Sequence, residues 1–191
     1  MKLSLKEKFM LFSYSLRIIL VFIFSQTAFA IYYEISGSPF DTTDAPLPEF
    51  IKPPHEKTII VNPNIHAWGA YNKNGKLIRW GIATAGAISC PDEGNSCYTK
   101  PGYYRIYSLG NESCISRKYP SPDGGAPMPY CMYFNGGQAL HGSSDVVFNN
   151  ESHGCVRIHV SDAKWLRYQF AEGPNANNQF RGTRIIIKAY E

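Results

Sequence analysis

The stretch HAWGAYNKNGKLIRWGIA, residues 66–83, decides the fold class. Two runs of apolar and aromatic residues, 66–71 and 77–83, flank the segment Lys73-Asn74-Gly75-Lys76. Strand-forming residues on either side of an Asn-Gly pair are typical of a β-hairpin with a tight turn. The stretch therefore predicts two antiparallel strands.

Outward from this hairpin, most of the remaining pattern also favours strands, in a chain of 191 residues with 16 Gly, 13 Pro and 13 Tyr. One helix is predicted, with Ser161 as its N-cap, with Ala163, Leu166 and Phe170 on one face, and with its end before Gly173. We predict a single mainly β domain with one or two short helices. Further strands are expected at 58–61, 102–108, 131–134, 138–141, 155–158 and 184–188.

The N-terminal residues have the pattern of a targeting segment. A basic start is followed by the apolar run 18–24 and by Ala28-x-Ala30, which is typical of a cleaved signal peptide at 1–30. An uncleaved anchor is the alternative, although Arg17 argues against it. Residues 31–56 form a proline-rich arm, and residues 57–191 the domain. We expect export to the periplasm or cell wall, or secretion.

The charge balance excludes one class of partner. The chain has 19 Lys and Arg against 15 Asp and Glu, but residues 1–30 hold four of these cations and one of the acids. The remaining 15 cations and 14 acids form no basic surface for nucleic acid.

Five cysteines in an exported chain indicate disulfides and one unpaired thiol. Four cysteines allow three pairings. Proximity and loop character favour Cys90 with Cys97 and Cys114 with Cys131, because each pair brackets a loop rich in turn residues. Cys155 is left over, either as a reactive thiol or as an inert buried thiol or intermolecular bridge.

Two histidines near Cys155 in the sequence, His141 and His153, favour the reactive thiol. A cysteine nucleophile needs an imidazole that takes the thiol proton and later protonates a leaving amine. Gly142 and Gly154 would let backbone N–H groups approach a developing oxyanion. These residues alone predict an exported cysteine acyl-transfer enzyme.

The segment Ser152-His153-Gly154-Cys155-Val156-Arg157, preceded by His141-Gly142, resembles the signature of the L,D-transpeptidase (YkuD-type) catalytic domain. Residues 99–106 are similar to the Thr-Pro-x-Gly-x-Tyr-x-Ile segment of that family, with Lys100-Pro101 where Thr-Pro is more usual. Residues 58–86, 161–166 and 182–188 resemble its opening strands, the helix after its active site and its last strand, in the right order.

The resemblance implies a β-sandwich-like domain that acts on peptidoglycan stem peptides without a cofactor. Cys155 would attack the carbonyl of the diamino acid in a tetrapeptide stem, and His141, oriented by the Gly142 carbonyl, would move the proton. Arg157 would favour an anionic stem carboxylate. Ser152, His153 and Gly154 would shape the turn and the oxyanion hole. A carbapenem-type inhibitor is expected to acylate Cys155.

Three functions are compatible with this sequence. The first is transfer of the acyl group to an amine, which would cross-link the wall or attach another acceptor. The second is a peptidoglycan hydrolase, meaning an L,D-carboxypeptidase, endopeptidase or amidase. The third is a non-catalytic protein that binds the wall or a host, against which the intact His141 and Cys155 argue.

Several of these residues also have structural interpretations. His153 could have no role beyond support of the turn. Arg157 could have no role beyond an ion pair with Glu151 or Asp162. His141, His153, Cys155 and His159 do not follow a usual zinc-ligand spacing, so no metal is predicted. The oligomeric state is not predicted.

Overall fold

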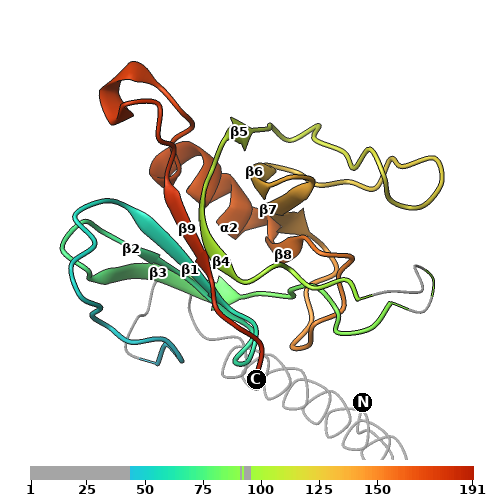
Figure 1. The fold of residues 1–191 in the computed structure, drawn as a ribbon, viewed down its shortest axis with the longest axis horizontal. Helices are drawn as coiled ribbons and strands as arrows, with labels where there is room; N and C mark the ends of the chain where they lie inside the picture. Colours follow the sequence, from blue (N-terminus) through green and yellow to red (C-terminus); the bar gives the residue numbers. More distant parts are fainter. Residues whose placement is uncertain (1–43, 91, 93–95) are drawn as a thin grey trace, which may run out of the picture. The chain divides into compact units, whose positions relative to one another are not determined.

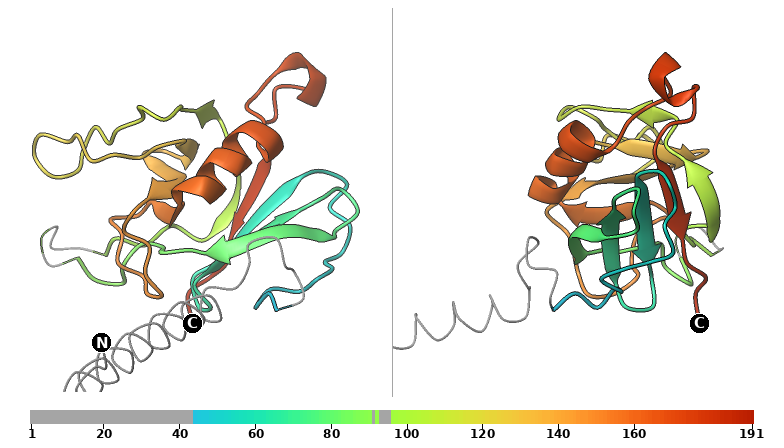
Figure 2. Two further views of the ribbon diagram at one scale, coloured as in Figure 1. Left: turned by 180° about the vertical axis from the view of Figure 1, so that it is seen from behind. Right: turned by 90° about the vertical axis from the view of Figure 1, so that its left-hand side faces the viewer.

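The computed structural model describes residues 44–90, 92 and 96–191. The predicted signal peptide and the first part of the proline-rich arm lie outside these residues. The described part of the chain forms two β-sheets with a helix packed beside them, as Figures 1 and 2 show. This arrangement confirms the predicted mainly β sandwich.

The first sheet has five strands in the order β3-β2-β1-β9-β4. They are β1 (Thr58–Asn62), β2 (Ala67–Tyr71), β3 (Leu77–Ile82), β4 (Gly102–Arg105) and β9 (Arg184–Ile187). β2 and β3 form the predicted antiparallel hairpin. The last strand, β9, is parallel to β1 on one side and antiparallel to β4 on the other. The end of the chain therefore joins the two halves of the sheet.

The second sheet has four strands in the order β5-β6-β7-β8. They are β5 (Ser108–Leu109), β6 (Met132–Asn135), β7 (Gln138–Ser143) and β8 (Val156–His159). β6 and β7 form an antiparallel hairpin, whereas β7 and β8 run parallel. A parallel pair brings the same ends of two strands together, and this pair carries the site described below.

The single strand predicted over 102–108 is wrong, because the chain changes sheet within it. Ile106 lies between β4 and β5, and its N–H donates to the Thr183 carbonyl over 2.9 Å. The next N–H, of Tyr107, donates to the Tyr133 carbonyl over 2.9 Å, on the other sheet. The Ile106 side chain is fully buried at this corner. A bend of this kind keeps the strand-like residue pattern, so the pattern alone did not reveal it.

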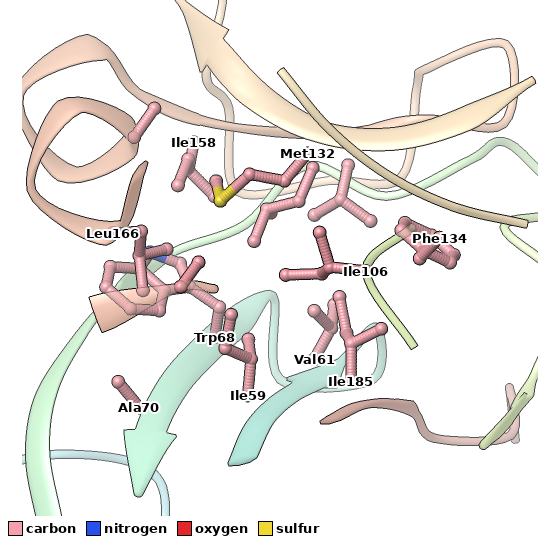
Figure 3. Close-up of a cluster of buried hydrophobic side chains, with 14 of the residues drawn as sticks. Ile59, Val61, Trp68, Ala70, Ile106, Met132, Phe134, Ile158, Leu166 and Ile185 are labelled. Atoms are coloured by element: carbon pink, nitrogen blue, oxygen red, sulfur yellow. The ribbon is translucent and has the colours of Figure 1, made fainter. Parts of the chain in front are cut away.

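The main core lies between the two sheets (Figure 3). Ile59, Trp68 and Ile185 reach it from the first sheet, and Met132 and Ile158 from the second. All five side chains are fully buried. Burying a side chain of this size contributes about 1.5–3 kcal/mol, so the contact between the sheets is a main source of stability.

The helix begins where β8 ends. It consists of α2 (Val160–Trp165) and a π-helical continuation, η1 (Leu166–Phe170), and the 3₁₀ turn η2 (Ala176–Asn178) follows. The predicted N-cap, Ser161, is wrong: the N-cap is His159, the last residue of β8, and its side chain makes no capping bond. The strand runs into the helix without a loop, so chain geometry rather than a capping side chain sets the start. No helix in the described ranges is long and apolar enough to cross a membrane.

The described part of the arm, residues 44–56, packs on the outer face of the first sheet. Leu47 is buried in a second cluster with Tyr71 and Leu77. The Leu77 N–H donates to the Glu49 carbonyl over 2.8 Å, and the Tyr71 hydroxyl donates to the Pro48 carbonyl over 2.9 Å. Burial raises the pKa of Tyr71 to about 12. The first sheet is therefore covered on both faces, which leaves the second sheet to form the site.

Candidate active site

Strands β7 and β8 place the predicted catalytic residues on one face of the second sheet. Leu140 lies opposite Val156, and His141 opposite Arg157. Leu140 and Val156 are fully buried in the main core. Because successive side chains of a strand point to opposite faces, His141 and Arg157 point away from that core. Cys155 directly precedes β8 and shares the face of Arg157, two residues later.

The turn before β8 fixes the backbone of Cys155. The buried Ser152 hydroxyl donates to the Cys155 carbonyl and accepts the Gly154 N–H over 3.2 Å. The Thr99 hydroxyl donates to the same carbonyl over 3.3 Å. Gly154 has φ +109°, a conformation that residues with a side chain rarely adopt, which explains the glycine at this position. In this structure the Gly154 N–H donates to the Ser152 hydroxyl within the turn.

His141 is held by the backbone next to it. Its Nδ1 lies 2.9 Å from the Gly142 carbonyl oxygen, and a carbonyl can only accept, so Nδ1 carries the proton. The neutral ring then has its lone pair on Nε2. Burial lowers the pKa of His141 to about 4; the bond to Gly142 opposes this shift, and the Arg157 guanidinium adds a smaller lowering. The imidazole is therefore neutral near pH 7 and able to accept a proton.

Cys155 is the one free thiol among the five cysteines, and it is partly exposed. Its Sγ lies 3.8 Å from the Gly137 carbonyl oxygen. Burial raises the pKa of the Cys155 thiol, while a bond from the Ala139 backbone and the Arg157 charge lower it in part. Burial thus disfavours the charged form of both residues, so the resting pair is a neutral thiol with a neutral imidazole.

Arg157 forms an ion pair, but with neither partner that the sequence suggested. Its Nη1 contacts Oδ2 of Asp145 at 2.5 Å. The expected partner Asp162 is instead buried, with its Oδ1 2.6 Å from Nη2 of Arg79. Glu151 accepts from the Asn149 side chain. The structural interpretation of Arg157 as the partner of Asp162 or Glu151 is therefore wrong.

His153 contacts two loops rather than the catalytic pair. Its Nε2 lies 2.7 Å from Oδ2 of Asp92, and its ring centroid is 4.6 Å from that of Tyr119, with the planes tilted by 37°. Asp92 comes from the loop after β3, and Tyr119 from the loop between β5 and β6. The imidazole therefore joins both loops to the turn that carries Cys155.

Two disulfides close these loops, and they are the pairs that proximity favoured. Cys90 is bonded to Cys97, and Cys114 to Cys131. Among the described residues, one group could bring three metal-ligand atoms within 4.8 Å of one another, namely Cys90, Cys97 and His153. The two sulfurs are bonded to each other, so this group offers no thiolate ligands.

Two hollows meet at Cys155. The first, a cavity of about 460 Å³, is lined by His141, Arg157 and Asp145 among others. The second, of about 510 Å³, is lined by Arg117 and Gln138 among others. Both share five lining residues: Ser116, Tyr119, Met128, His153 and Cys155. The thiol can therefore be approached from two sides of the loop between β5 and β6, which contributes Ser116, Tyr119 and Met128.

Four site residues were not identified from the sequence. Thr99 lies within the segment that resembled the family, so its contact with the Cys155 backbone had a local signal. Asp145, Asp92 and Tyr119 had none, because their partners lie 12, 61 and 34 positions away in the chain and only the fold brings them together.

The model of the L,D-transpeptidase catalytic domain family (YkuD) matches residues 56–187. No curated protein matches the sequence significantly. Among solved structures, the L,D-transpeptidase of Xylanimonas cellulosilytica has a TM-score of 0.55 at 24% identity, covering 69% of this chain and 60% of that one.

Two further solved structures have the same fold. An L,D-transpeptidase from Stackebrandtia nassauensis has a TM-score of 0.55 at 16% identity, covering 78% of this chain and 62% of that one. L,D-transpeptidase 3 from Mycobacterium tuberculosis, in complex with a faropenem-derived adduct, has a TM-score of 0.50 at 15% identity, covering 70% and 60%. The chain thus spans about three fifths of the length of these structures. The family model covers more than half of the chain, and the chain belongs to the L,D-transpeptidase (YkuD) family.

Proposed function

We propose that this protein is an exported cysteine acyltransferase that forms a thioester between Cys155 and a peptidoglycan stem peptide. One observation carries the proposal: the only free thiol lies on the same sheet face as a buried, neutral histidine, at the junction of two hollows. Membership of the L,D-transpeptidase family supports the substrate class. Export is supported by the two disulfides, since such bonds persist outside the cytoplasm.

The first half of the reaction uses the neutral pair. As Sγ of Cys155 attacks the carbonyl of the diamino acid, its proton moves to Nε2 of His141. The imidazolium then gives this proton to the leaving amine of the terminal D-alanine, and a thioester remains. The pKa directions favour this concerted transfer over a preformed thiolate, because burial disfavours both charged forms.

In the second half, an acceptor amine attacks the thioester carbonyl and passes its proton to Nε2 of His141. The C–S bond then breaks, the imidazolium returns this proton to Sγ, and Cys155 leaves as the thiol while a new amide bond remains. An acyltransferase must admit two molecules to one sulfur, and the two hollows beside Cys155 provide space for both. Arg157 lies in the first hollow, where its guanidinium can bind a stem carboxylate if Asp145 releases it.

The test is a product analysis. The purified protein is mixed with tetrapeptide-stem fragments, with and without added amine acceptor, and the products are weighed by mass spectrometry. Release of D-alanine together with stems joined between diamino acids supports the transferase. Free tripeptide stems at every amine concentration would instead establish the hydrolase, and no change in the stems would favour a non-catalytic protein. Cys155→Ala is the matched inactive control.

A further inference from the structure

Residues 115–129, within the loop that the Cys114–Cys131 disulfide closes, lie over the face that carries Cys155, and we call them the covering loop. It keeps its shape through its own bonds. The Ser116 hydroxyl accepts the Tyr119 N–H over 2.8 Å, the Ala126 N–H donates to the Tyr119 carbonyl over 2.9 Å, and the Gly125 N–H donates to the Ser116 carbonyl over 2.8 Å. The covering loop is therefore a folded unit whose position can be fixed by a few contacts.

Its base is anchored to the second sheet. The Cys114–Cys131 disulfide closes it, and the Gly142 N–H donates to the Pro129 carbonyl over 2.8 Å. Met128 is buried against Cys131 and Ala139, in a cluster that Cys155 borders. This half of the covering loop is held firmly beside the thiol.

The outer half of the covering loop contacts the turn 152–155 through an aromatic pair. Tyr119 lies against the ring of His153, and Nζ of Lys118 is 4.8 Å from the centroid of the Tyr119 ring. His153 is in turn bound through Nε2 to Asp92, which lies within the loop closed by Cys90 and Cys97.

We propose that Asp92, His153 and Tyr119 form a clasp that holds the covering loop over the Cys155 thioester and so directs the acyl group to an amine instead of water. Asp92 and His153 are positioning residues in this account. Tyr119 and Ser116 border both hollows, so a shift of the covering loop changes the access of water to the sulfur from both sides. The consequence for the acyl group rests on the proposed function, whereas the shielding of the thiol does not.

The exposure of the Asp92–His153 contact sets the expected change in the ratio of hydrolysed to transferred product. The Asp92 side chain is 63% exposed and that of His153 31% exposed, so their pair is weak. An exposed pair shifts an open–closed equilibrium up to about fivefold, which corresponds to about 1 kcal/mol. We therefore expect Asp92→Asn to raise the ratio of hydrolysed to transferred product by about two- to fivefold.

The experiment compares variants that loosen the clasp at separate points. Asp92→Asn removes the carboxylate, Tyr119→Leu removes the ring, and the double variant Cys90→Ser/Cys97→Ser releases the loop that carries Asp92. Tyr119→Phe retains the ring and should retain the wild-type ratio. Asp123→Asn is the matched control, because this exposed carboxylate of the covering loop contacts no partner within the part of the chain that the structure describes.

Two readouts are taken for each variant. The first is the ratio of free tripeptide to cross-linked product as the acceptor concentration rises. The second is the rate at which iodoacetamide alkylates Cys155 in the folded protein, which measures shielding without any transfer chemistry. Faster alkylation and more hydrolysis are expected in the three loosened variants. The melting temperature should be unchanged in Asp92→Asn and lower in Cys90→Ser/Cys97→Ser, because that variant loses a disulfide.

Wild-type alkylation rates in Asp92→Asn and Tyr119→Leu would overturn the clasp, as would an equal rise in Asp123→Asn. If alkylation accelerates but the product ratio is unchanged, the loop shields the thiol without directing the acyl group, and the proposal is wrong in that part. If the wild-type protein forms no cross-linked product, the proposed function fails, and the alkylation rates still decide whether the clasp exists.

Discussion

Lowering the pH should destabilise the protein through His141, and the size of the effect follows from its burial. In the unfolded chain this histidine takes up a proton near its ordinary pKa of 6.5, whereas in the folded protein burial lowers the pKa to about 4. Between these values the unfolded state binds one proton more than the folded state, so stability falls as the pH falls. The difference of about 2.5 pH units corresponds to about 3 kcal/mol, lost between roughly pH 7 and pH 4.

The assay is urea unfolding at several pH values between 7 and 4, for the wild type and for His141→Gln. Carboxylates also titrate over this range, but they are common to both proteins, so the informative quantity is the difference between the two curves. Wild type should lose about 3 kcal/mol more than His141→Gln on going to pH 4. His55→Gln, which removes an exposed histidine, is the control and should follow the wild type. An identical loss in wild type and His141→Gln would refute the burial of a neutral imidazole.

Three further predictions follow from single contacts. Asp162→Ala should lower the free energy of unfolding by about 3–5 kcal/mol, measured by chemical denaturation, because it removes the carboxylate that pairs with the buried Arg79 charge; a loss below about 1 kcal/mol would contradict this. Alkylation of the unreduced, denatured protein should label Cys155 alone, and label on any other cysteine would disprove the disulfide pairs. Gly154→Ala should slow acylation of Cys155 at least tenfold, because φ +109° costs a side-chain-bearing residue about 1–3 kcal/mol; wild-type acylation rates would show that the turn tolerates another conformation.

Much of the fold could be predicted because its signals are local. The hairpin of β2 and β3 has its Asn-Gly turn within the segment itself, and the apolar run at 184–187 identifies β9 as a strand. The sequence did not reveal that the chain changes sheet at Ile106, since both strands share one residue pattern. The start of α2 was also missed, because a strand that runs directly into a helix needs no capping side chain.

The candidate site could likewise be predicted only where its signals are local in the sequence. Cys155, His141 and Gly142 lie in short motifs, and the parallel register of β7 and β8 brings these motifs together. The partners of the charged residues could not be predicted. Arg157 has several acidic neighbours in the sequence, and only the path of the loop after β7 selects Asp145. Burial, which sets the protonation of His141 and Cys155, likewise depends on the packed structure.

The central claim, that Cys155 forms an acyl-enzyme with His141 as its base, is tested most directly by intact-protein mass spectrometry after incubation with a carbapenem. The strained lactam carbonyl meets the same thiol as the peptide carbonyl, and a solved L,D-transpeptidase of the same fold carries a faropenem-derived adduct. The mass of the wild type should rise by one drug molecule, with the modified peptide mapping to Cys155. Cys155→Ala should show no gain, and His141→Gln should gain the same mass far more slowly. An unmodified wild type, or an adduct that persists in Cys155→Ala, would contradict the account.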